Sequence, residues 1–578
     1  MPPDSLPDPE ARSGARQPIV LATINARHAH ASLGLRYLKA NAGALRERIA
    51  IVELVIAGDV DAMAARILAR LAPRGPRIVG FGVYIWNVGK TTALVSRIRA
   101  LAPEVVLVGG GPELSHELDR QPLGSMLDYV IQGPGDLAFA RLAKAVLDGP
   151  RPLARVIAGD QPADLGALVL PYALYDAHDI AHRHLYVEAS RGCPFKCEFC
   201  LSALDRTAWP FPLDPFVDAL RALHARGARR FRFVDRTFNL RAATGERVLR
   251  FFLDANRAAP HDPCFAHFEL VPDHLPDALR TLIAAFAPGT LQFEIGIQTL
   301  DPAVQRAIGR RQDDVKALAN IAWLRARTHA HLHVDLIAGL PGESMASFGR
   351  GFDRLCALDP HEIQIGVLKR LRGAPIVRHE SAGTLHFDAA PPYRVLRTDA
   401  MTAHELDEIV ELARFHDRVV NSGRMPRLAD ALLRRPAPQD AGPGAGAPHS
   451  PFERLRRLAA ALTARFGRSH AIAFEALVDA TADFLVLHGV ASRADADAMA
   501  ANDYAASGAH GRIASMRQGI GARGAPIDGS PAPRAGTPAA AALASAASAA
   551  SAAAAPATPA SPAAPATPVR QRRHLHRA

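Results

Sequence analysis

The chain has little cysteine, no long apolar run and no recognisable targeting segment. Five cysteines among 578 residues are too sparse for a disulfide framework, which needs a dense, even set in an oxidising compartment. No run of about 20 apolar residues is present, so no membrane span is expected. The first residues lack a basic segment followed by an apolar one, so no signal peptide is expected. These absences predict a cytoplasmic protein with reduced cysteines and no membrane partner.

The basic charge is unevenly distributed. The net charge is +11, but residues 505–578 contain eight arginines and one aspartate and so carry +7 of it. The first 504 residues carry only +4. Because the basic residues gather in a tail, the charge argues against a nucleic acid partner for the rest of the chain.

The first half of the chain alternates short apolar strands with helical patterns. With 49% apolar residues the chain can build two or three cores. Apolar strands separated by helices predict a doubly wound parallel sheet covered on both faces, with a ligand beyond the carboxyl ends of its strands. The strand candidates are residues 19–24, 50–54, 78–84, 105–108 and 129–131.

Loops at those carboxyl ends contain the candidate ligand-binding residues of this domain. Glycines allow a ligand to approach the backbone closely, and Tyr84 and Trp86 could stack on a large flat ligand. His28 and His30 lie in the first such loop, where packing within the loop explains them equally well. The candidates are Tyr84, Trp86, Asn87, Gly109, Gly110, Gly111, Glu113 and Gly133.

A second series of six β/α units follows a proline-containing connector. Barrel-like arrangements of such units place their active sites at the carboxyl ends of the strands. Asp235, Glu269, Gln298 and Asp335 lie at or near such ends, although each could equally be a structural polar residue lining a barrel. The strand candidates are residues 185–189, 231–234, 265–270, 291–297, 333–337 and 363–367.

Three cysteines follow the first strand of this second series in a CxxxCxxC pattern: Cys193, Cys197 and Cys200. Three thiolates on one loop can hold three irons of a 4Fe-4S cube and leave the fourth iron open to a small molecule. A zinc site usually takes four ligands in CxxC pairs, and the other cysteines, Cys264 and Cys356, are distant in sequence. The pattern favours an iron–sulfur cluster, with zinc or a chance spacing as the alternatives.

CxxxCxxC with Phe199 before the last cysteine resembles the signature of the radical S-adenosylmethionine (SAM) superfamily. The resemblance implies a partial barrel of six β/α units, a 4Fe-4S cluster whose open iron binds SAM, and reductive cleavage of SAM to a 5′-deoxyadenosyl radical. It also implies that Phe199 packs on the adenine, that Gln298 holds the ribose and that Asp235 lies near the methionine end. A reductant such as flavodoxin or ferredoxin would be a partner.

The N-terminal region resembles the cobalamin-binding domain that precedes many radical SAM domains. The matching loops are residues 84–87, 109–113 and, less well, 133–136. The DxHxxG pattern that supplies a histidine to cobalt is absent, so cobalamin would bind without one. Residues 368–375 and 393–427 resemble a subgroup of these proteins with an uncharacterised C-terminal helical domain.

The predicted fold class is α/β, with a doubly wound sheet, a partial (β/α)6 barrel and a helical C-terminal region. The predicted segments are a leader (1–17), the cobalamin-binding-like domain (18–150), a connector (151–180), the barrel (181–375), the helical domain (376–505, with a linker at 436–451) and a disordered Ala/Pro-rich basic tail (506–578).

The resemblance implies an enzyme that uses a 4Fe-4S cluster, SAM and cobalamin to methylate an unactivated carbon of a small-molecule substrate. Cobalamin could instead serve electron transfer, or its domain could be an empty relic. Two other functions stay open: modification of tRNA by methylthiolation, and a non-catalytic iron–sulfur redox sensor. No motif identifies the substrate.

Overall fold

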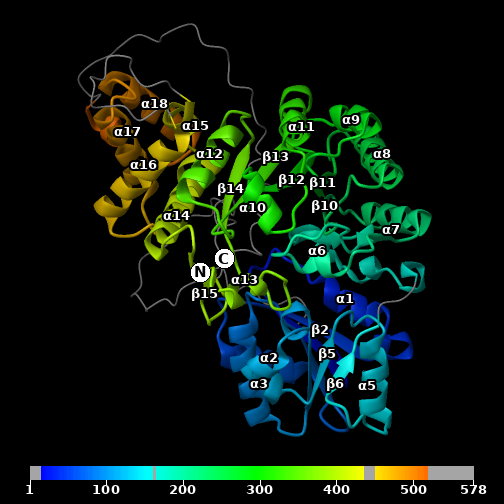
Figure 1. Cartoon of the computed structure of the whole chain (residues 1–578). Coiled ribbons are helices and arrows are strands. Elements are labelled where there is room, and N and C mark those ends of the chain that lie inside the picture. The colour runs from blue at the N-terminus through cyan, green and yellow to red at the C-terminus, as the bar shows by residue number, and fades with distance from the viewer. Residues whose placement is uncertain (1–14, 161–163, 435–449, 519–578) are drawn as a thin grey trace.

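The computed structural model describes residues 15–160, 164–434 and 450–518. Figure 1 shows an N-terminal α/β domain next to a second α/β domain, with a group of C-terminal helices against the far edge of the second domain. The predicted leader (1–17), linker (436–451) and basic tail (506–578) lie mostly outside the described residues, and the domain boundaries stay predictions. Within the described ranges no helix is both long and apolar enough to cross a membrane.

The N-terminal sheet is parallel, with strand order β2-β1-β3-β4-β5-β6. Two separate clusters of buried side chains, one led by Val20 and Val52 and the other by Ile19 and Leu21, cover its two faces. This arrangement confirms the doubly wound fold. The strands are β1 (Ile19–Asn25), β2 (Ile49–Val55), β3 (Ile78–Gly82), β4 (Val106–Gly110), β5 (Tyr129–Gln132) and β6 (Val156–Ala158).

The sixth strand, β6, was not predicted, because the sequence places residues 151–180 in a connector. It is only three residues long and largely exposed, so its composition carries no strong strand pattern. The helices of the domain begin at side-chain caps where the sequence supplies them, as Ser32 does for α1 and Asp59 for α2. They are α1 (Leu33–Ala40), α2 (Val60–Arg70), α3 (Val88–Leu101), α4 (Pro122–Met126) and α5 (Ala138–Asp148).

The second domain is a partial barrel of six parallel strands in the order β14-β13-β12-β11-β10-β7, as predicted. Its two edge strands, β7 and β14, do not pair with each other. The strands are β7 (Leu185–Val187), β10 (Arg230–Phe233), β11 (Phe265–Leu270), β12 (Leu291–Gln298), β13 (His331–Ala338) and β14 (Glu362–Val367). The helices are α6 (Ala177–His182), α7 (Leu213–Ala225), α8 (Ala242–Ala258), α9 (Asp277–Ala284), α10 (Pro302–Ala307), α11 (Asp314–Arg327) and α12 (Met345–Cys356).

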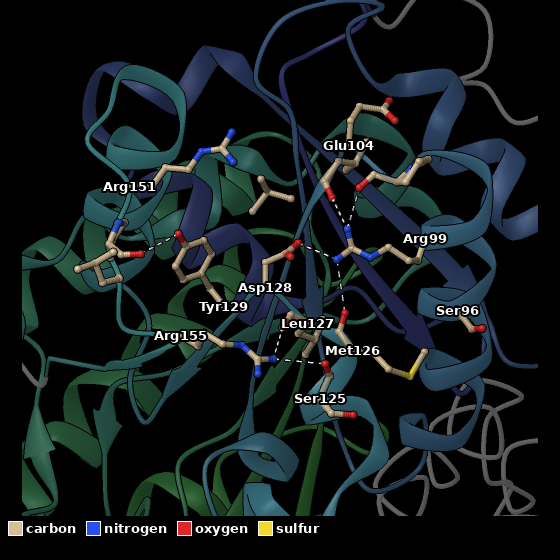
Figure 2. Close-up of a pocket in the computed structure, with 15 residues that line it drawn as sticks. Ser96, Arg99, Glu104, Ser125, Met126, Leu127, Asp128, Tyr129, Arg151 and Arg155 are labelled. Carbon is tan, nitrogen blue, oxygen red and sulfur yellow. Dashed lines mark hydrogen bonds and ion pairs between the residues drawn. The ribbon is translucent and has the colours of Figure 1, made fainter.

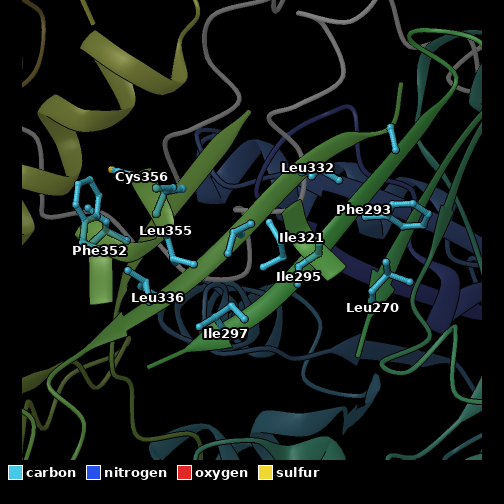
Figure 3. Close-up of a cluster of buried hydrophobic side chains, with 14 of the residues drawn as sticks. Leu270, Phe293, Ile295, Ile297, Ile321, Leu332, Leu336, Phe352, Leu355 and Cys356 are labelled. Atoms are coloured by element: carbon cyan, nitrogen blue, oxygen red, sulfur yellow. The ribbon is translucent and has the colours of Figure 1, made fainter. Parts of the chain in front are cut away.

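Strand β12 shows how alternation separates the barrel core from the barrel lumen. Phe293, Ile295 and Ile297 are buried and point toward the covering helices, where Phe352 and Leu355 of α12 belong to the same cluster (Figure 3). Side chains of a strand alternate between its two faces. The alternate residues Gln292, Glu294, Gly296 and Gln298 therefore face the lumen.

The C-terminal region, predicted to be helical, also contains an antiparallel pair of strands after a first short helix. Thr398 ends a strand, and its Oγ1 accepts hydrogen bonds from the backbone N–H groups of Ala400 and Met401. Helices then pack on α12 and β14, beside the barrel (Figure 1). The elements are α13 (Val377–Ser381), β15 (Leu385–Phe387), β16 (Val395–Thr398), α14 (Ala403–His416), α15 (Pro426–Arg434), α16 (Pro451–Phe466), α17 (Phe474–Leu487), α18 (Arg493–Ala506) and α19 (Ala514–Gln518).

One buried carboxyl group connects the loops that follow β12 and β13. Thr299 donates a hydrogen bond of 2.5 Å to Glu343, whose exposed fraction is 1%. Burial raises the pKa of Glu343 to about 8, and the hydrogen bond from Thr299 only partly opposes this rise. The side chain is therefore protonated in the folded protein at neutral pH.

Helix α12 packs closely on α16 because Gly349 has no side chain: a Cβ atom there would lie 2.6 Å from the ring of Phe452. We predict that Gly349→Ala lowers stability by about 1–3 kcal/mol, because the two helices must move apart. Thermal unfolding followed by circular dichroism measures the effect. Gly89→Ala is the matched control, since nothing lies within 4 Å of that exposed helical position. An unchanged midpoint for Gly349→Ala would contradict the close contact.

The pKa of Glu343 predicts a pH dependence of stability. Its folded pKa, about 8, exceeds the ordinary value of 4.5, so its contribution is complete below pH 4.5 and is lost as the pH rises through about 8. Between pH 6.5 and pH 9 the wild type should lose roughly 2 kcal/mol more than Glu343→Gln, which cannot ionise. Denaturant unfolding at both pH values measures this difference. Glu47→Gln, at an exposed glutamate, should show no such difference, and identical pH profiles for wild type and Glu343→Gln would refute the assignment.

Candidate functional site

We call the loop that contains Cys193, Cys197 and Cys200 the cysteine loop. It follows β7, the first barrel strand, and is held by backbone contacts. The N–H of Cys193 donates to the carbonyl of Asp205 (2.7 Å), and the N–H of Cys200 donates to the carbonyl of Cys197 (3.1 Å). Gly192 has a φ of 87° and lies so close to Asp205 that a Cβ atom would be 2.8 Å from its side chain. The loop therefore requires glycine immediately before its first cysteine.

All three cysteines of the motif are free thiols near one another in space. Burial raises the pKa of Cys193 and Cys197, and Arg310 opposes the rise at Cys197. In the described ranges no group of three or more His, Cys, Asp or Glu side chains could hold a single metal ion. A cube needs each thiolate on a different iron, so this donor set fits a three-cysteine 4Fe-4S cluster.

Asp235 supports the segment that leads into the cysteine loop. Its carboxylate, 2% exposed, accepts hydrogen bonds from the backbone N–H of Ala189 (3.0 Å) and from the hydroxyl of Ser190 (2.6 Å). Burial raises the pKa of Asp235 to about 7, against these two hydrogen bonds. Both carboxylate oxygens thus have partners in the chain, and contact with SAM stays a prediction for this residue.

Gln298 lies at a bulge at the end of β12. Its φ is 68°, and the register between β12 and β13 shifts between Gly296 and Gln298. The side chain folds back over Gly296, where a Cβ atom would clash with its Nε2. Its Oε1 is buried and has no hydrogen-bond partner among the described residues. An orphaned acceptor facing the lumen fits a ribose hydroxyl, the predicted ligand group, although the role itself stays a prediction.

Arg310 is a site residue that sequence reasoning missed. It follows α10, and its Nη1 lies 3.6 Å from the Sγ of Cys197. The same guanidinium donates to the carbonyl of Gly296 and to Gln312. It therefore connects the cysteine loop to the end of β12. No spacing motif distinguishes this arginine from its neighbour Arg311.

The barrel lumen contains a layer of ionisable side chains at matching registers. Glu269 lies opposite Glu294, and Glu294 lies opposite His333. Burial raises the pKa of Glu269 to about 7, and burial together with Glu294 raises that of Asp335 to about 6. Burial also favours the neutral form of Glu294, but the neighbouring histidines outweigh it and lower its pKa. Glu269 and Asp335 thus face the lumen, as predicted from their positions; contact with cofactor or substrate stays a prediction.

Asn87 has a structural role at the edge of the N-terminal sheet. Fully buried, it accepts a hydrogen bond from the N–H of Tyr84 (2.8 Å) and donates to the carbonyls of Ile24 (3.0 Å) and Gly82 (3.2 Å). It thereby joins the ends of β1 and β3. Tyr84 and Trp86 stack with ring centres 4.4 Å apart. The indole N–H of Trp86 is buried without a partner within the described residues, and so remains available to a ligand.

The glycines at this edge fall into two kinds. Gly109 and Gly111 lie against their own chain: a Cβ atom on Gly109 would clash with Leu127, and one on Gly111 would lie 2.5 Å from the carbonyl oxygen of Val83. Gly110 similarly faces Ile131. Gly133, with a φ of 83°, has nothing within 4 Å of its Cβ position. Open space at Gly133 and the unpartnered indole of Trp86 fit a large ligand beyond the strand ends.

Glu113 connects the two domains. It is 3% exposed and accepts hydrogen bonds from Arg372 (3.0 Å) and from the hydroxyl of Tyr393 (2.7 Å), both from the chain that follows β14. Nearby, Glu117 accepts from Arg370 (2.9 Å) and Arg372 (3.3 Å). The loop after β4 is thus joined to the loop after β14, which sequence reasoning did not predict for Glu113.

A second connection joins the cysteine loop to the loop after β5. Arg191, two residues before Cys193, donates to both carboxylate oxygens of Asp136 (2.9 and 3.2 Å) and to Glu188 (2.9 Å). Its guanidinium lies 4.6 Å from the ring centre of Tyr37. Burial alone would lower the pKa of Arg191, but Glu188 and Asp136 raise it above its ordinary value. Sequence reasoning also missed this pair.

A groove of about 850 Å³ lies elsewhere in the molecule (Figure 2). It is lined by the residues that precede β4, β5 and β6, so it opens at the amino ends of these strands. Arg99 and Asp128 form an ion pair of 2.7 Å within it, and Arg155 donates to main-chain carbonyls. Its polar groups are largely used within the chain, and it lies at the edge opposite to the predicted site.

Two family models match the chain. The model described as "B12 binding domain" matches residues 19–143, and the model described as "Radical SAM superfamily" matches residues 187–355. Together they cover about half of the chain and coincide with the two α/β domains. A radical SAM domain implies a 4Fe-4S cluster and SAM, and a B12 binding domain implies cobalamin.

Two curated relatives are methyltransferases. The chain is 23% identical over 334 residues to the cobalamin-dependent radical SAM methyltransferase TokK of Streptomyces tokunonensis, covering 52% of this chain and 48% of that protein. It is 24% identical over 335 residues to 2-(S-pantetheinyl)-carbapenam-3-carboxylate methyltransferase of Streptantibioticus cattleyicolor, with the same coverage. The chain thus spans about half the length of these relatives.

Among solved structures, the cobalamin-dependent SAM radical enzyme OxsB with aqua-cobalamin bound matches with a TM-score of 0.53 and 11% identity. The match covers 85% of this chain and 84% of OxsB, so it supports the fold over most of the chain. Taken with the cysteine loop and the two matched domains, these findings show that the chain belongs to the radical SAM superfamily, in the subgroup that carries a B12 binding domain ahead of the radical SAM domain.

Proposed function

We propose that this protein cleaves SAM reductively and, with cobalamin, methylates an unactivated carbon of a small-molecule substrate. The observation that carries the proposal is the contact between the two predicted cofactor sites. Arg191, next to the cluster-binding Cys193, pairs with Asp136 in a loop at the ligand edge of the B12 binding domain. The carboxyl ends of the two sheets thus contribute to one region between the domains.

Cys193, Cys197 and Cys200 would hold the cluster as thiolates, and the edge formed by Trp86 and Gly133 would receive cobalamin. When bound, the cluster supplies the electron that cleaves SAM, and cobalamin supplies the methyl group. Arg310 places a positive charge beside Cys197, and hydrogen bonds to a ligand sulfur favour the reduced, more negative form of a cluster.

Around the cysteines, the chain's own residues bind and orient the small molecules. Gln298 offers its free Oε1 to the ribose of SAM. Phe199, which packs partly against the barrel core, offers a flat apolar surface to the adenine. Glu269 and Asp335, whose pKa values burial raises, provide polar groups in the lumen that can accept or donate a hydrogen bond near neutral pH.

The two other functions make different predictions. A non-catalytic redox sensor would hold the cluster and produce no 5′-deoxyadenosine from SAM and reductant. A tRNA-modifying enzyme would produce it and would bind tRNA. To test for a role of cobalamin, hydroxocobalamin is added to the protein before reconstitution, and the yield of 5′-deoxyadenosine is compared with and without it. A yield that depends on cobalamin favours the proposed methylation over both other functions.

The cysteine motif can be tested against a matched cysteine outside it. After anaerobic reconstitution, wild type with SAM and dithionite should release 5′-deoxyadenosine, measured by liquid chromatography. Cys197→Ala removes one of three iron ligands and should release none above background. Cys264→Ala removes an equally buried thiol of the adjoining core and should keep both the cluster absorbance and the product. Activity in Cys197→Ala equal to wild type would refute the cluster assignment.

The proposed cobalamin site at Trp86 and Gly133 can be tested by measuring cobalamin binding, without any catalytic assay. Trp86→Ala removes one ring of the stack with Tyr84 and should weaken hydroxocobalamin binding roughly tenfold, as expected for the loss of one aromatic contact. Equilibrium dialysis with visible absorbance measures the affinity. Trp323→Ala, which removes a tryptophan that contacts Arg280 in the barrel domain, should leave the affinity unchanged. Equal affinities in the two variants would place cobalamin elsewhere.

A further inference from the structure

Reductive cleavage needs one electron for each SAM molecule, so an external donor must reduce the proposed cluster again after each cleavage. This inference therefore rests on the proposed function. A donor must reach the protein surface close to the cysteine loop, because the electron has to pass from its redox centre to the cluster through the intervening atoms. The cysteine loop comes close to the surface on the side of α10.

The contact between the cysteine loop and the turn after α10 is close. The N–H of Glu198 donates to the carbonyl of Ile308 (2.9 Å), and a Cβ atom on Gly309 would lie 2.8 Å from the carbonyl oxygen of Lys196. Arg310 follows directly and lies 3.6 Å from the Sγ of Cys197. It also lines a groove of about 420 Å³ together with the exposed Arg306 and Arg311. One side chain thus separates this groove from a cluster ligand.

The surface around this turn has free positive charge. Lys196, Arg306 and Arg311 are exposed, and none of them has an ion pair or side-chain hydrogen bond within the described part of the chain. Arg378, 58% exposed, lies beside them: it donates to the carbonyl of Ala307 and pairs with Glu198. We call Lys196, Arg306, Arg311 and Arg378 the cationic patch.

Two carboxylates of this surface are in ion pairs: Glu198 with Arg378 (2.7 Å) and Asp313 with Lys316 (3.1 Å). Asp273, which lines the groove, accepts a hydrogen bond from the backbone N–H of Asp313 (2.8 Å) and keeps its negative charge. Lys196, Arg306 and Arg311 outnumber it, so the patch is net positive. Val315, 79% exposed, adds an apolar side chain near the groove. A charged rim with a small apolar contact is typical of transient protein interfaces.

We propose that the cationic patch is the docking surface for a small acidic protein that carries a one-electron redox centre. Complementary charge steers such a partner to the surface next to Arg310 and Cys197. One electron leaves the partner's redox centre and one enters the cluster, and no atom or proton is transferred. Arg306 and Arg311 of the patch line the groove together with Arg310, which lies 3.6 Å from the Sγ of Cys197.

The experiment uses the reconstituted full-length protein and a reduced acidic flavodoxin as the probe. Cluster reduction is followed by the loss of visible absorbance, once with flavodoxin and once with dithionite as the donor. The test variant is Lys196→Glu/Arg306→Glu/Arg311→Glu. The matched control is Arg74→Glu/Arg151→Glu/Arg327→Glu, which makes the same change in net charge at exposed arginines before β3, β6 and β13.

We expect the test variant to be reduced by flavodoxin at least roughly tenfold more slowly than wild type at low ionic strength. Its reduction by dithionite should slow far less, because this small anion needs no docking surface, and the control variant should match wild type with both donors. The effect should shrink at high salt, because ions screen exposed charges. The dissociation constant for oxidised flavodoxin, measured by calorimetry, should rise in parallel in the test variant.

Equal flavodoxin rates in the test variant and wild type would overturn the proposal, and so would an equal loss in the control variant. If the charge reversals prevent folding or cluster assembly, the variant with Gln at the same three positions replaces them, with the same expected direction. A patch that binds tRNA and not flavodoxin would also overturn it. Wild type that is reduced by dithionite but releases no 5′-deoxyadenosine would refute the proposed function and leave the docking surface intact.

Discussion

The structure depends on a set of charged contacts that hold two separately folded domains in a fixed position. Arg191 is the central one, because it lies two residues before Cys193, a predicted cluster ligand, and binds Asp136 of the other domain with two hydrogen bonds. Buried pairs of this kind add little net stability over apolar contacts, but breaking one leaves an uncompensated charge and is costly. Their effect is to allow one relative position of the domains and to penalise others.

Hydrogen bonds within the chain also position the loops around each predicted site. Asp235 and the carbonyl of Asp205 hold the cysteine loop, and Asn87 holds the loop ends of the N-terminal sheet. These groups use their hydrogen-bonding capacity within the chain. Among the buried polar atoms without a partner in the described residues are the Oε1 of Gln298 and the indole N–H of Trp86, one at each predicted ligand site. The partnered groups hold the loops in place, and these two unpartnered groups can bind a ligand.

Sequence patterns predicted most of the fold, because buried parallel strands are continuous apolar runs and their order follows from regular β/α alternation. They missed β6, which is short and exposed, and they missed the strand pair β15 and β16 within the segment predicted to be helical. The three cysteines could be proposed as cluster ligands because one short segment contains all of them, and their role stays a prediction. The partners of Asp235, Glu113 and Arg191 were not predictable, since hydrogen bonds to residues far along the chain leave no local pattern. Arg310 was missed for the same reason.

The domain contacts involve both edges of the open barrel. Its edge strands, β7 and β14, do not pair, so hydrogen bonds between strands do not set the width of the gap between them. The segment after β7 is held by the loop after β5 through Arg191, and the segment after β14 is held by the loop after β4 through Arg372. Strands β4 and β5 are neighbours in one sheet. The N-terminal domain thus connects the segments that follow the two unpaired edge strands, through the loops after two neighbouring strands of its own sheet.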